Sequence, residues 1–376
     1  MLPGIPLNRS FLPPLEDFIA GLGEIWETGQ VSNDGPILKR FEEKLARYLG
    51  TDQLCAVANG TLGLQIALQA MCAPGSEVIT TPFTFVATAN AIVAAGLKPV
   101  FVDVEPTYYT LDPFRVEEAI TPQTSAILPV HIYGYPCQVD VFEEIAQRRG
   151  VKLIYDAAQA FGVRHRGRDI GSYGDASVFS FHGTKIMHTC EGGLICYRDA
   201  RLGSLLSKWR HFGFEGDLNV SLPGTNAKMN ELSALMGCLN LEYVEGNILR
   251  RQRLVDLYYK ELGDVPGIEL APPLPAEVRY NCAYMPVLVN AREFGRVRTS
   301  LYRALQRMGI ATRRYFYPLV SRYRYYKRIG SKQPLLVAGC ISQRVLSLPL
   351  FSDMHESQVL RVCDAIRNLR IEGKLS

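Results

Sequence analysis

Apolar and polar positions along the first part of the chain alternate between helical spacing and short continuous apolar runs. Residues 36–49 (PILKRFEEKLARYL) place apolar side chains at helical spacing and are followed by Gly50, a common helix stop. Further helical patterns follow the turn at 59–61 and the segment TPFTF, and two more lie near 115–120 and 140–149. Strand-like apolar runs are VIT, KPVFVDV, TSAILPV, VKLIYD, SVFSF and GGLICYR. Strands alternating with helices over about 200 residues predict a mostly parallel sheet with helices on both faces.

The C-terminal part of the chain has a different pattern. It begins with a long helical stretch (ELSALMGCLNLEYVEGNILRRQRLVDLYYKEL) that is interrupted only near Gly246. A strand (YMPVLV), a helix (FGRVRTSLYRALQRMG) and a terminal helix (SQVLRVCDAIRNL) follow. Because 376 residues exceed the size at which one core keeps growing, we expect two domains. The expected division is a large α/β domain at 1–244 and a smaller α+β domain at 245–376.

Composition changes this picture little. Hydrophobic residues make up 47% of the chain, and the net charge is +4 with 21% charged residues, so the charge gives no reason to expect a nucleic-acid or membrane partner. A local cluster of Lys, Arg and Tyr occupies 313–328, and it is either a solvated surface strip or a site for a phosphate-bearing small substrate. No RNA-recognition or zinc-finger pattern accompanies the cluster.

Cysteine usage and the N-terminus indicate the compartment. The nine cysteines are odd in number and form no C-x-x-C pair, which favours reduced thiols over a disulfide framework or a zinc ribbon. The N-terminus (MLPGIPLNRSFLPP) is broken by prolines and has no apolar core typical of a signal peptide. No apolar run reaches the roughly 18 residues that a spanning helix needs. We therefore expect a soluble cytoplasmic protein.

Polar residues at the ends of predicted strands are the first candidates for chemistry, since ligands bind outside the carboxyl ends of strands in such sheets. The turn Asn59-Gly60-Thr61 and Asp156 occupy such ends, and Lys185 lies in the connection between two predicted strands. Alone, a loop lysine is usually solvated and an aspartate at a strand end is often structural. Together they fit pyridoxal phosphate (PLP), which needs an amine for a Schiff base, a carboxylate at the pyridine nitrogen and N–H or hydroxyl groups at the phosphate. The Gly60-Thr61 turn with Ser180 could hold the phosphate.

Several longer motifs, in one order along nearly the whole chain, resemble the DegT/StrS family of PLP-dependent sugar aminotransferases. The motifs are GQVSNDGPILKRFEEKLARYLG, ANGTLGLQIAL, TTPFTFVATANAIVAAGLKPVFVDVEPTYYTLDP, VHIYGYPCQVD, DAAQAFG, SFHGTKIMHTCEGG and GTNAKMNELSALMG. The resemblance implies an α/β protein of fold-type I, similar to aspartate aminotransferase. It also implies transfer of an amino group from L-glutamate to a nucleotide-linked keto sugar, for surface polysaccharide or natural-product synthesis.

The resemblance also implies roles for individual residues. Lys185 would form the Schiff base with PLP and carry the proton between substrate and cofactor, and Asp156 would pair with the pyridine nitrogen. Gln159 would contact the ring oxygen, and Phe85 would stack on the ring. The phosphate would be held by Gly60, Thr61 and Ser180. Asn226, in the GTN motif, would reach the phosphate of a neighbouring subunit, which implies a homodimer with shared sites.

The substrate-side residues are less well defined by the resemblance. Some relatives carry His at the lysine position and are dehydratases, so Lys185 favours transamination. His182 and His188 flank this lysine, and each either packs or touches substrate. Lys228 stands where many relatives carry Arg, which keeps the charge but loses the guanidinium fork.

The segment RRYFYPL lacks the histidine that many relatives have beside Tyr-Pro. It resembles members that make dTDP-4-amino-4,6-dideoxyglucose, which favours amination at C4 of a 4-keto-6-deoxy sugar. Arg313, Arg314 and Tyr315 are candidates for substrate contact or simply part of a basic surface. The alternatives are a C3 aminotransferase acting on a 3-keto isomer and a PLP-fold sensor or binding protein that does not turn over.

Overall fold

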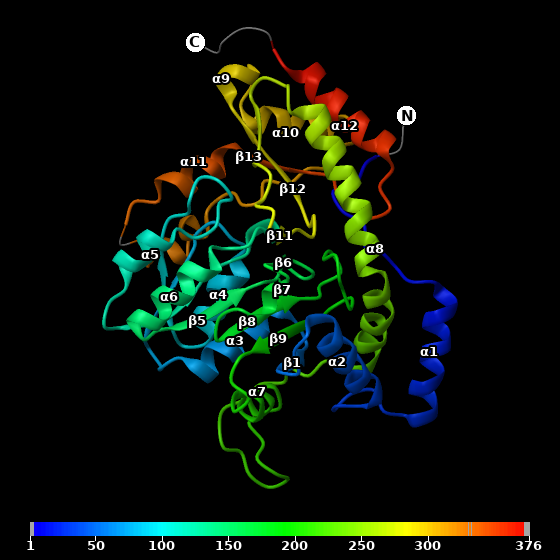
Figure 1. Cartoon of the computed structure of the whole chain (residues 1–376), viewed down its shortest axis with the longest axis vertical. Helices are drawn as coiled ribbons and strands as arrows, with labels where there is room; N and C mark the ends of the chain where they lie inside the picture. Colours follow the sequence, from blue (N-terminus) through cyan, green and yellow to red (C-terminus); the bar gives the residue numbers. More distant parts are fainter. Residues whose placement is uncertain (1–3, 330, 332, 372–376) are drawn as a thin grey trace.

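A seven-stranded sheet forms the centre of the first part of the chain (Figure 1). The computed structural model describes residues 4–329, 331 and 333–371. The strands in spatial order are β1 (Leu54–Val57), β9 (Gly193–Tyr197), β8 (Ala176–Ser180), β5 (Lys152–Asp156), β4 (Thr124–Leu128), β2 (Glu77–Thr80) and β3 (Lys98–Phe101). Only β9 runs antiparallel to its neighbours, so the sheet is mostly parallel, as predicted.

Both faces of this sheet are covered by helices, because alternate residues of each strand point to opposite sides. Ala56 of β1 belongs to one apolar cluster, while its neighbours Cys55 and Val57 belong to another. The first cluster contains side chains of α2 (Pro36–Leu49), α5 (Pro113–Ala119), α6 (Val139–Arg149) and α8 (Glu231–Leu262). The second contains side chains of α3 (Gly60–Met71), α4 (Val86–Ala94) and α7 (Leu202–Arg210). The result is a three-layer α/β architecture.

A second apolar core lies in the C-terminal part of the chain. It surrounds a three-stranded antiparallel sheet of β10 (Ile268–Leu270), β12 (Met285–Val289) and β13 (Val345–Leu348). The helices α9 (Ala291–Phe294), α10 (Arg298–Arg307), α11 (Leu336–Arg344) and α12 (Glu356–Leu369) accompany this sheet. A third, small sheet joins β11 (Val278–Arg279) to the hairpin of β6 (Arg164–His165) and β7 (Arg168–Asp169).

Helix α8 runs through both parts of the molecule (Figure 1). Its 32 residues would span about 48 Å at 1.5 Å per residue. Val244 and Ile248 pack in the core of the large sheet, whereas Leu254 and Tyr258 pack in the C-terminal core. The helix passes Gly246 without a break, so the expected interruption there is wrong. The expected division at 244/245 falls inside α8, and we retain it as a prediction.

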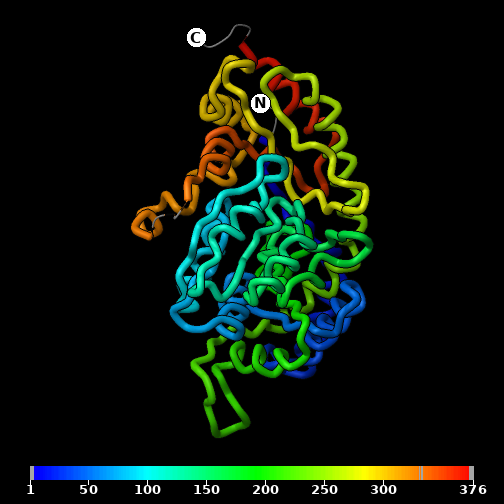
Figure 2. The backbone as a smooth tube through the Cα atoms, turned by 60° about the vertical axis from the view of Figure 1, so that its left-hand side comes forward, coloured from blue at the N-terminus to red at the C-terminus, as the bar shows by residue number. Residues whose placement is uncertain are grey.

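Two elements extend from the body of the molecule. Helix α1 (Leu15–Thr28) packs on α8 but lies apart from the sheet, with Leu15, Ile19 and Trp26 exposed (Figure 1). The segment 211–225 protrudes beyond α7 in both views (Figures 1 and 2). Neither feature was expected from the apolar pattern. None of the helices in the described residues is long and apolar enough to cross a membrane.

Candidate active site

Three strand ends bring the predicted residues to one edge of the large sheet. Asp156 is the last residue of β5, Ser180 is the last residue of β8, and Gly60 begins the helix that follows β1. These three strands point in the same direction, so their carboxyl ends meet at that edge. Lys185 lies in the β8–β9 connection, above the same edge.

Asp156 provides a buried and well-bonded carboxylate. It is 5% exposed; its Oδ2 accepts a hydrogen bond from Thr88 Oγ1 at 2.7 Å, and its Oδ1 accepts one from the Ala158 N–H at 3.1 Å. Burial raises the pKa of Asp156, while the bonds from Thr88 and Ala158 and the nearby Lys185 charge oppose that rise. The carboxylate and the Lys185 amine therefore lie close enough to interact electrostatically.

The Lys185 amine lies against a tyrosine from the C-terminal part of the chain. Its Nζ donates to the Tyr284 hydroxyl at 3.4 Å and lies 5.9 Å from the centroid of that ring. A narrow cavity is lined by Gln159, Ser180, Lys185 and Tyr284, together with Ala158, Phe161, Thr184, Ile186 and Ala283. The sequence did not single out Tyr284, because a tyrosine at the start of an apolar strand looks like a core residue.

The turn at Asn59-Gly60 is shaped to receive an anion. Asn59 caps α3 by accepting a hydrogen bond from the Leu62 N–H at 2.9 Å. A Cβ atom on Gly60 would lie 3.0 Å from the Cβ of Ser180, so only glycine lets the helix approach the end of β8 this closely. The free N–H groups and the dipole of α3 favour a negative group here. The exposed Thr61 and the partly exposed Ser180 add hydroxyls.

Comparison with known proteins agrees with this geometry. The sequence model of the DegT/DnrJ/EryC1/StrS aminotransferase family matches residues 15–367. The chain belongs to this aminotransferase family. It is 39% identical to a dTDP-4-amino-4,6-dideoxy-D-glucose transaminase of Shigella dysenteriae, with 96% of this chain and 97% of that protein aligned. A transaminase of the same name from Escherichia coli is 38% identical, with 95% and 96% aligned. The crystal structure of DesI with its TDP-sugar product superposes with a TM-score of 0.92 at 34% identity, covering 98% and 93% of the two chains.

These findings confirm the predicted family, the fold class, the aminotransferase activity and PLP as the cofactor. The residues at the strand ends also fit PLP chemically. The close approach of Gly60 to the end of β8 leaves backbone N–H groups available to bind a phosphate. The buried Asp156 carboxylate suits a protonated ring nitrogen, and the Lys185 amine suits an aldehyde. The assignment of each residue to its role remains a proposal.

Two further candidates lie beside this group in the aminotransferase. Gln159 is 8% exposed, its side-chain oxygen accepts from the Tyr133 N–H, and its backbone oxygen accepts from Asn281 Nδ2 at 2.9 Å. Phe85 precedes the first turn of α4, the same turn that carries Thr88, and its ring is 59% exposed. An exposed phenylalanine at this end of the sheet has a free face available for stacking.

Asn226 is exposed on the segment that follows the protruding residues. The carbonyl of the next residue, Ala227, accepts a hydrogen bond from the Ala58 N–H at 2.7 Å. The GTN segment therefore lies, within one chain, next to the strand end that leads into the phosphate turn. The predicted role of Asn226 across a subunit boundary is not tested by this contact and stays a prediction.

The two histidines near Lys185 have different environments. The His182 side chain is about half exposed, and its Nδ1 lies 2.9 Å from Thr184 Oγ1. His188 is 2% exposed, its Nε2 lies 2.6 Å from the carbonyl of Phe11, and burial lowers its pKa. His188 is thus a packed and hydrogen-bonded residue, whereas His182 remains open to substrate.

The three candidates in the C-terminal part of the chain also separate. The Arg313 backbone pairs with Ser347, and the Arg314 guanidinium lies 5.0 Å from the Tyr302 ring. The Tyr315 ring packs edge-on against Tyr284, whose hydroxyl bonds to Lys185, with the ring centroids 6.1 Å apart. Tyr315 is therefore the best placed of the three to contact substrate.

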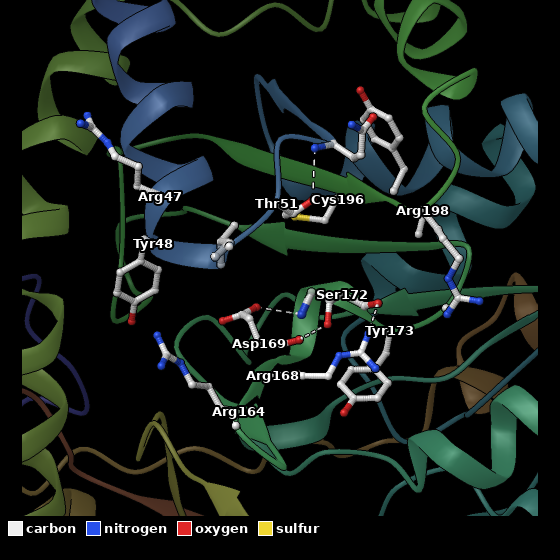
Figure 3. A pocket seen from close by; sticks show the side chains of 18 residues that line it. Arg47, Tyr48, Thr51, Arg164, Arg168, Asp169, Ser172, Tyr173, Cys196 and Arg198 are labelled. Carbon is white, nitrogen blue, oxygen red and sulfur yellow. Dashed lines mark hydrogen bonds between the residues drawn. The ribbon is translucent and has the colours of Figure 1, made fainter.

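A larger cleft of about 590 Å³ lies at the opposite edge of the sheet, near the start of β8 and the end of β9 (Figure 3). It is lined by Arg47, Tyr48, Arg164, Asp169 and Tyr197, among others. None of the predicted site residues lines this cleft. The cleft with the larger volume is therefore not the one that contains the candidate active-site residues of this aminotransferase.

Proposed function

We propose that this aminotransferase moves an amino group from L-glutamate to C4 of a dTDP-linked 4-keto-6-deoxy sugar, giving a 4-amino-4,6-dideoxy sugar. The observation that carries the proposal is the 39% identity, over nearly the whole length of both chains, with the Shigella dTDP-4-amino-4,6-dideoxy-D-glucose transaminase. The segment RRYFYPL, which contains Tyr315, agrees with the same chemistry.

The roles we assign to the residues follow from their positions. PLP, when bound, withdraws electrons from the carbon that carries the transferred amine. The Asp156 carboxylate would keep a proton on the ring nitrogen. The Lys185 amine would carry a proton from the donor carbon to the cofactor in the first half of the reaction, and from the cofactor to the sugar carbon in the second half. Tyr284 would hold the Lys185 amine between these positions through its hydroxyl. Gly60, Thr61 and Ser180 would fix the phosphate.

The working form we propose is a homodimer in which Asn226 of each chain contacts the PLP phosphate bound by the other chain. Apolar side chains exposed on the protomer support an interface of this kind. They lie on α1 (Leu15, Ile19 and Trp26) and on the protruding segment (Phe212, Phe214, Leu218 and Val220). A second copy of the chain would remove these groups from water. The cytoplasmic location remains a prediction.

The test is to incubate the purified protein with L-glutamate and dTDP-4-keto-6-deoxyglucose, and to locate the new amine by NMR. We expect an amine at C4. Product from the 3-keto isomer alone would refute the C4 assignment, and bound PLP without turnover of either sugar would favour a sensor. Lys185→Ala should abolish turnover, while Lys98→Ala, which changes an exposed lysine at the start of β3, should not.

A further inference from the structure

Two buried threonine hydroxyls form a chain that ends on the Asp156 carboxylate. Thr84 Oγ1 lies 2.9 Å from Thr88 Oγ1, and Thr88 Oγ1 lies 2.7 Å from Asp156 Oδ2. The two threonines are 4% and 1% exposed. Thr84 lies in the β2–α4 connection and Thr88 in the first turn of α4, so one short segment supplies both hydroxyls.

The order of the protons in this chain follows from the chemistry of its members. An ionised carboxylate only accepts hydrogen bonds, so Thr88 must give its single hydroxyl proton to Asp156. Thr88 can then only accept from Thr84, which must act as the donor of that pair. Both protons are directed toward the carboxylate, and this arrangement favours its charged form.

The remaining groups around Asp156 give it limited support. The Ala158 N–H occupies Oδ1, Lys185 contributes its charge, and the buried thiol of Cys137 lies within electrostatic range. Burial works against ionisation of Asp156, and the Thr88 bond is the largest of the opposing contributions. Among the described side chains, Thr88 is the hydroxyl that bonds to this carboxylate.

We propose that Thr88 is a positioning residue that keeps Asp156 charged and aimed at the ring nitrogen of PLP, with Thr84 orienting the Thr88 hydroxyl. The proposal rests on the assignment of Asp156 as the partner of that nitrogen. Because one carboxylate oxygen can accept two hydrogen bonds, Oδ2 can bond to Thr88 and still accept from a protonated ring. The residue would thus set the protonation of the cofactor without touching it.

A structural role for Thr88 predicts a different outcome from a positioning role. Thr80 is a matched control, because it is equally buried and its hydroxyl donates to the Leu128 carbonyl at 2.8 Å. Thr80→Val removes one buried hydroxyl from the same sheet without touching Asp156. If both Thr80→Val and Thr88→Val lower the free energy of unfolding by the same amount, that shared loss reports the removal of a buried hydroxyl and not an effect on Asp156.

The experiment uses the full-length protein, stripped of PLP and reloaded with ¹⁵N-labelled PLP. We measure the PLP dissociation constant and the pH at which the ring nitrogen loses its proton by NMR. Thr88→Val should weaken PLP binding about tenfold and lower that pH by about one unit, since hydrogen bonds to charged groups have this magnitude. Thr88→Ser should restore both values, Thr84→Val should shift them in the same direction but less, and Thr80→Val should leave them unchanged.

Two results would overturn the proposal. A wild-type nitrogen titration in Thr88→Val shows that the hydroxyl does not control the carboxylate; should that variant not fold, an unchanged titration in Thr84→Val decides the same question. Asp156→Asn separates the assignments, because an unchanged titration there refutes the partner role of Asp156 itself, and with it that of Thr88. A shift in Asp156→Asn without one in Thr88→Val refutes the role of Thr88 alone.

Discussion

Replacing Asp169 with asparagine should stabilise the protein more at pH 8 than at pH 5. Asp169 lines the larger cleft and is 6% exposed (Figure 3). Its Oδ1 accepts a hydrogen bond from the Gly171 N–H at 2.8 Å, but its Oδ2 has no hydrogen-bond partner among the described residues. Burial raises the pKa of Asp169 to about 7, against the influence of Gly171, Arg164 and Arg279.

The direction of this pH effect on stability follows from proton linkage. The ordinary pKa of 3.8 applies to the unfolded chain, so between 3.8 and about 7 the folded protein holds a proton that the unfolded chain has lost. Stability therefore falls with rising pH through this window, by about 1.4 kcal/mol for each pH unit. Asparagine does not ionise and lacks this fall. From pH 5 to pH 8, the free energy of unfolding of Asp169→Asn should rise relative to wild type by about 3 kcal/mol.

Urea unfolding of both proteins, saturated with PLP and at one protein concentration, measures this difference at pH 5, 6, 7 and 8. The asparagine keeps an oxygen for the Gly171 N–H, so any cost of its new amide group is the same at every pH. Asp217→Asn, on the exposed segment 211–225, is the matched control and should change stability by less than about 0.5 kcal/mol throughout. A difference between Asp169→Asn and wild type that does not vary with pH would refute the reasoning.

Three further substitutions test other parts of the structure. Gly60→Ala should weaken PLP binding at least tenfold by titration of the apoprotein, because its Cβ would lie 3.0 Å from that of Ser180; unchanged binding would contradict a tight approach. Tyr284→Phe should lower kcat about tenfold with little change in KM, because the Lys185 amine loses its hydrogen bond to the hydroxyl at 3.4 Å. A change in KM alone would assign Tyr284 to substrate binding instead. Phe41→Ala should cost about 3–5 kcal/mol in urea unfolding, because the ring is 0% exposed between α2 and α8; a loss below about 1 kcal/mol would show that the core closes around the cavity.

Much of the large sheet is predictable from the sequence because its strands are buried on both faces. Their apolar runs, such as SVFSF, leave little choice of structure, and the turns between them carry glycine or proline. Helix α1 is not predictable in the same way, since its apolar side chains Leu15, Ile19 and Trp26 are exposed in the protomer rather than buried in a core. The break expected near Gly246 is absent because the buried neighbours Val244 and Ile248 offset the roughly 1 kcal/mol that glycine costs in a helix.

The candidate site divides along similar lines. Lys185, Asp156 and Gly60 are identifiable from the sequence only as a set, because the amine, the carboxylate and the small turn together match what PLP needs and lie in motifs of the family. Thr88 and Tyr284 are not, because each takes its role from a contact across the fold: Thr88 meets Asp156 68 residues away, and Tyr284 meets Lys185 99 residues away. A threonine in a helical pattern and a tyrosine beside an apolar strand give no chemical signal of their own.

The position of Tyr284 depends on how the two cores are held together. Arg251 of α8 is 3% exposed. Its guanidinium donates to the Ala283 carbonyl at 3.3 Å and to Ser352 Oγ at 3.1 Å. Among the described residues, no carboxylate forms an ion pair with it. Burial lowers its pKa to about 10, so the side chain still carries its charge at neutral pH, at a free-energy cost that two hydrogen bonds offset only in part. Such a residue is poorly explained by stability alone. Arg251 does tie α8 to the residue that precedes Tyr284, and the Tyr284 hydroxyl in turn lies 3.4 Å from the Lys185 amine, so one short set of contacts links the C-terminal core to the edge of the large sheet.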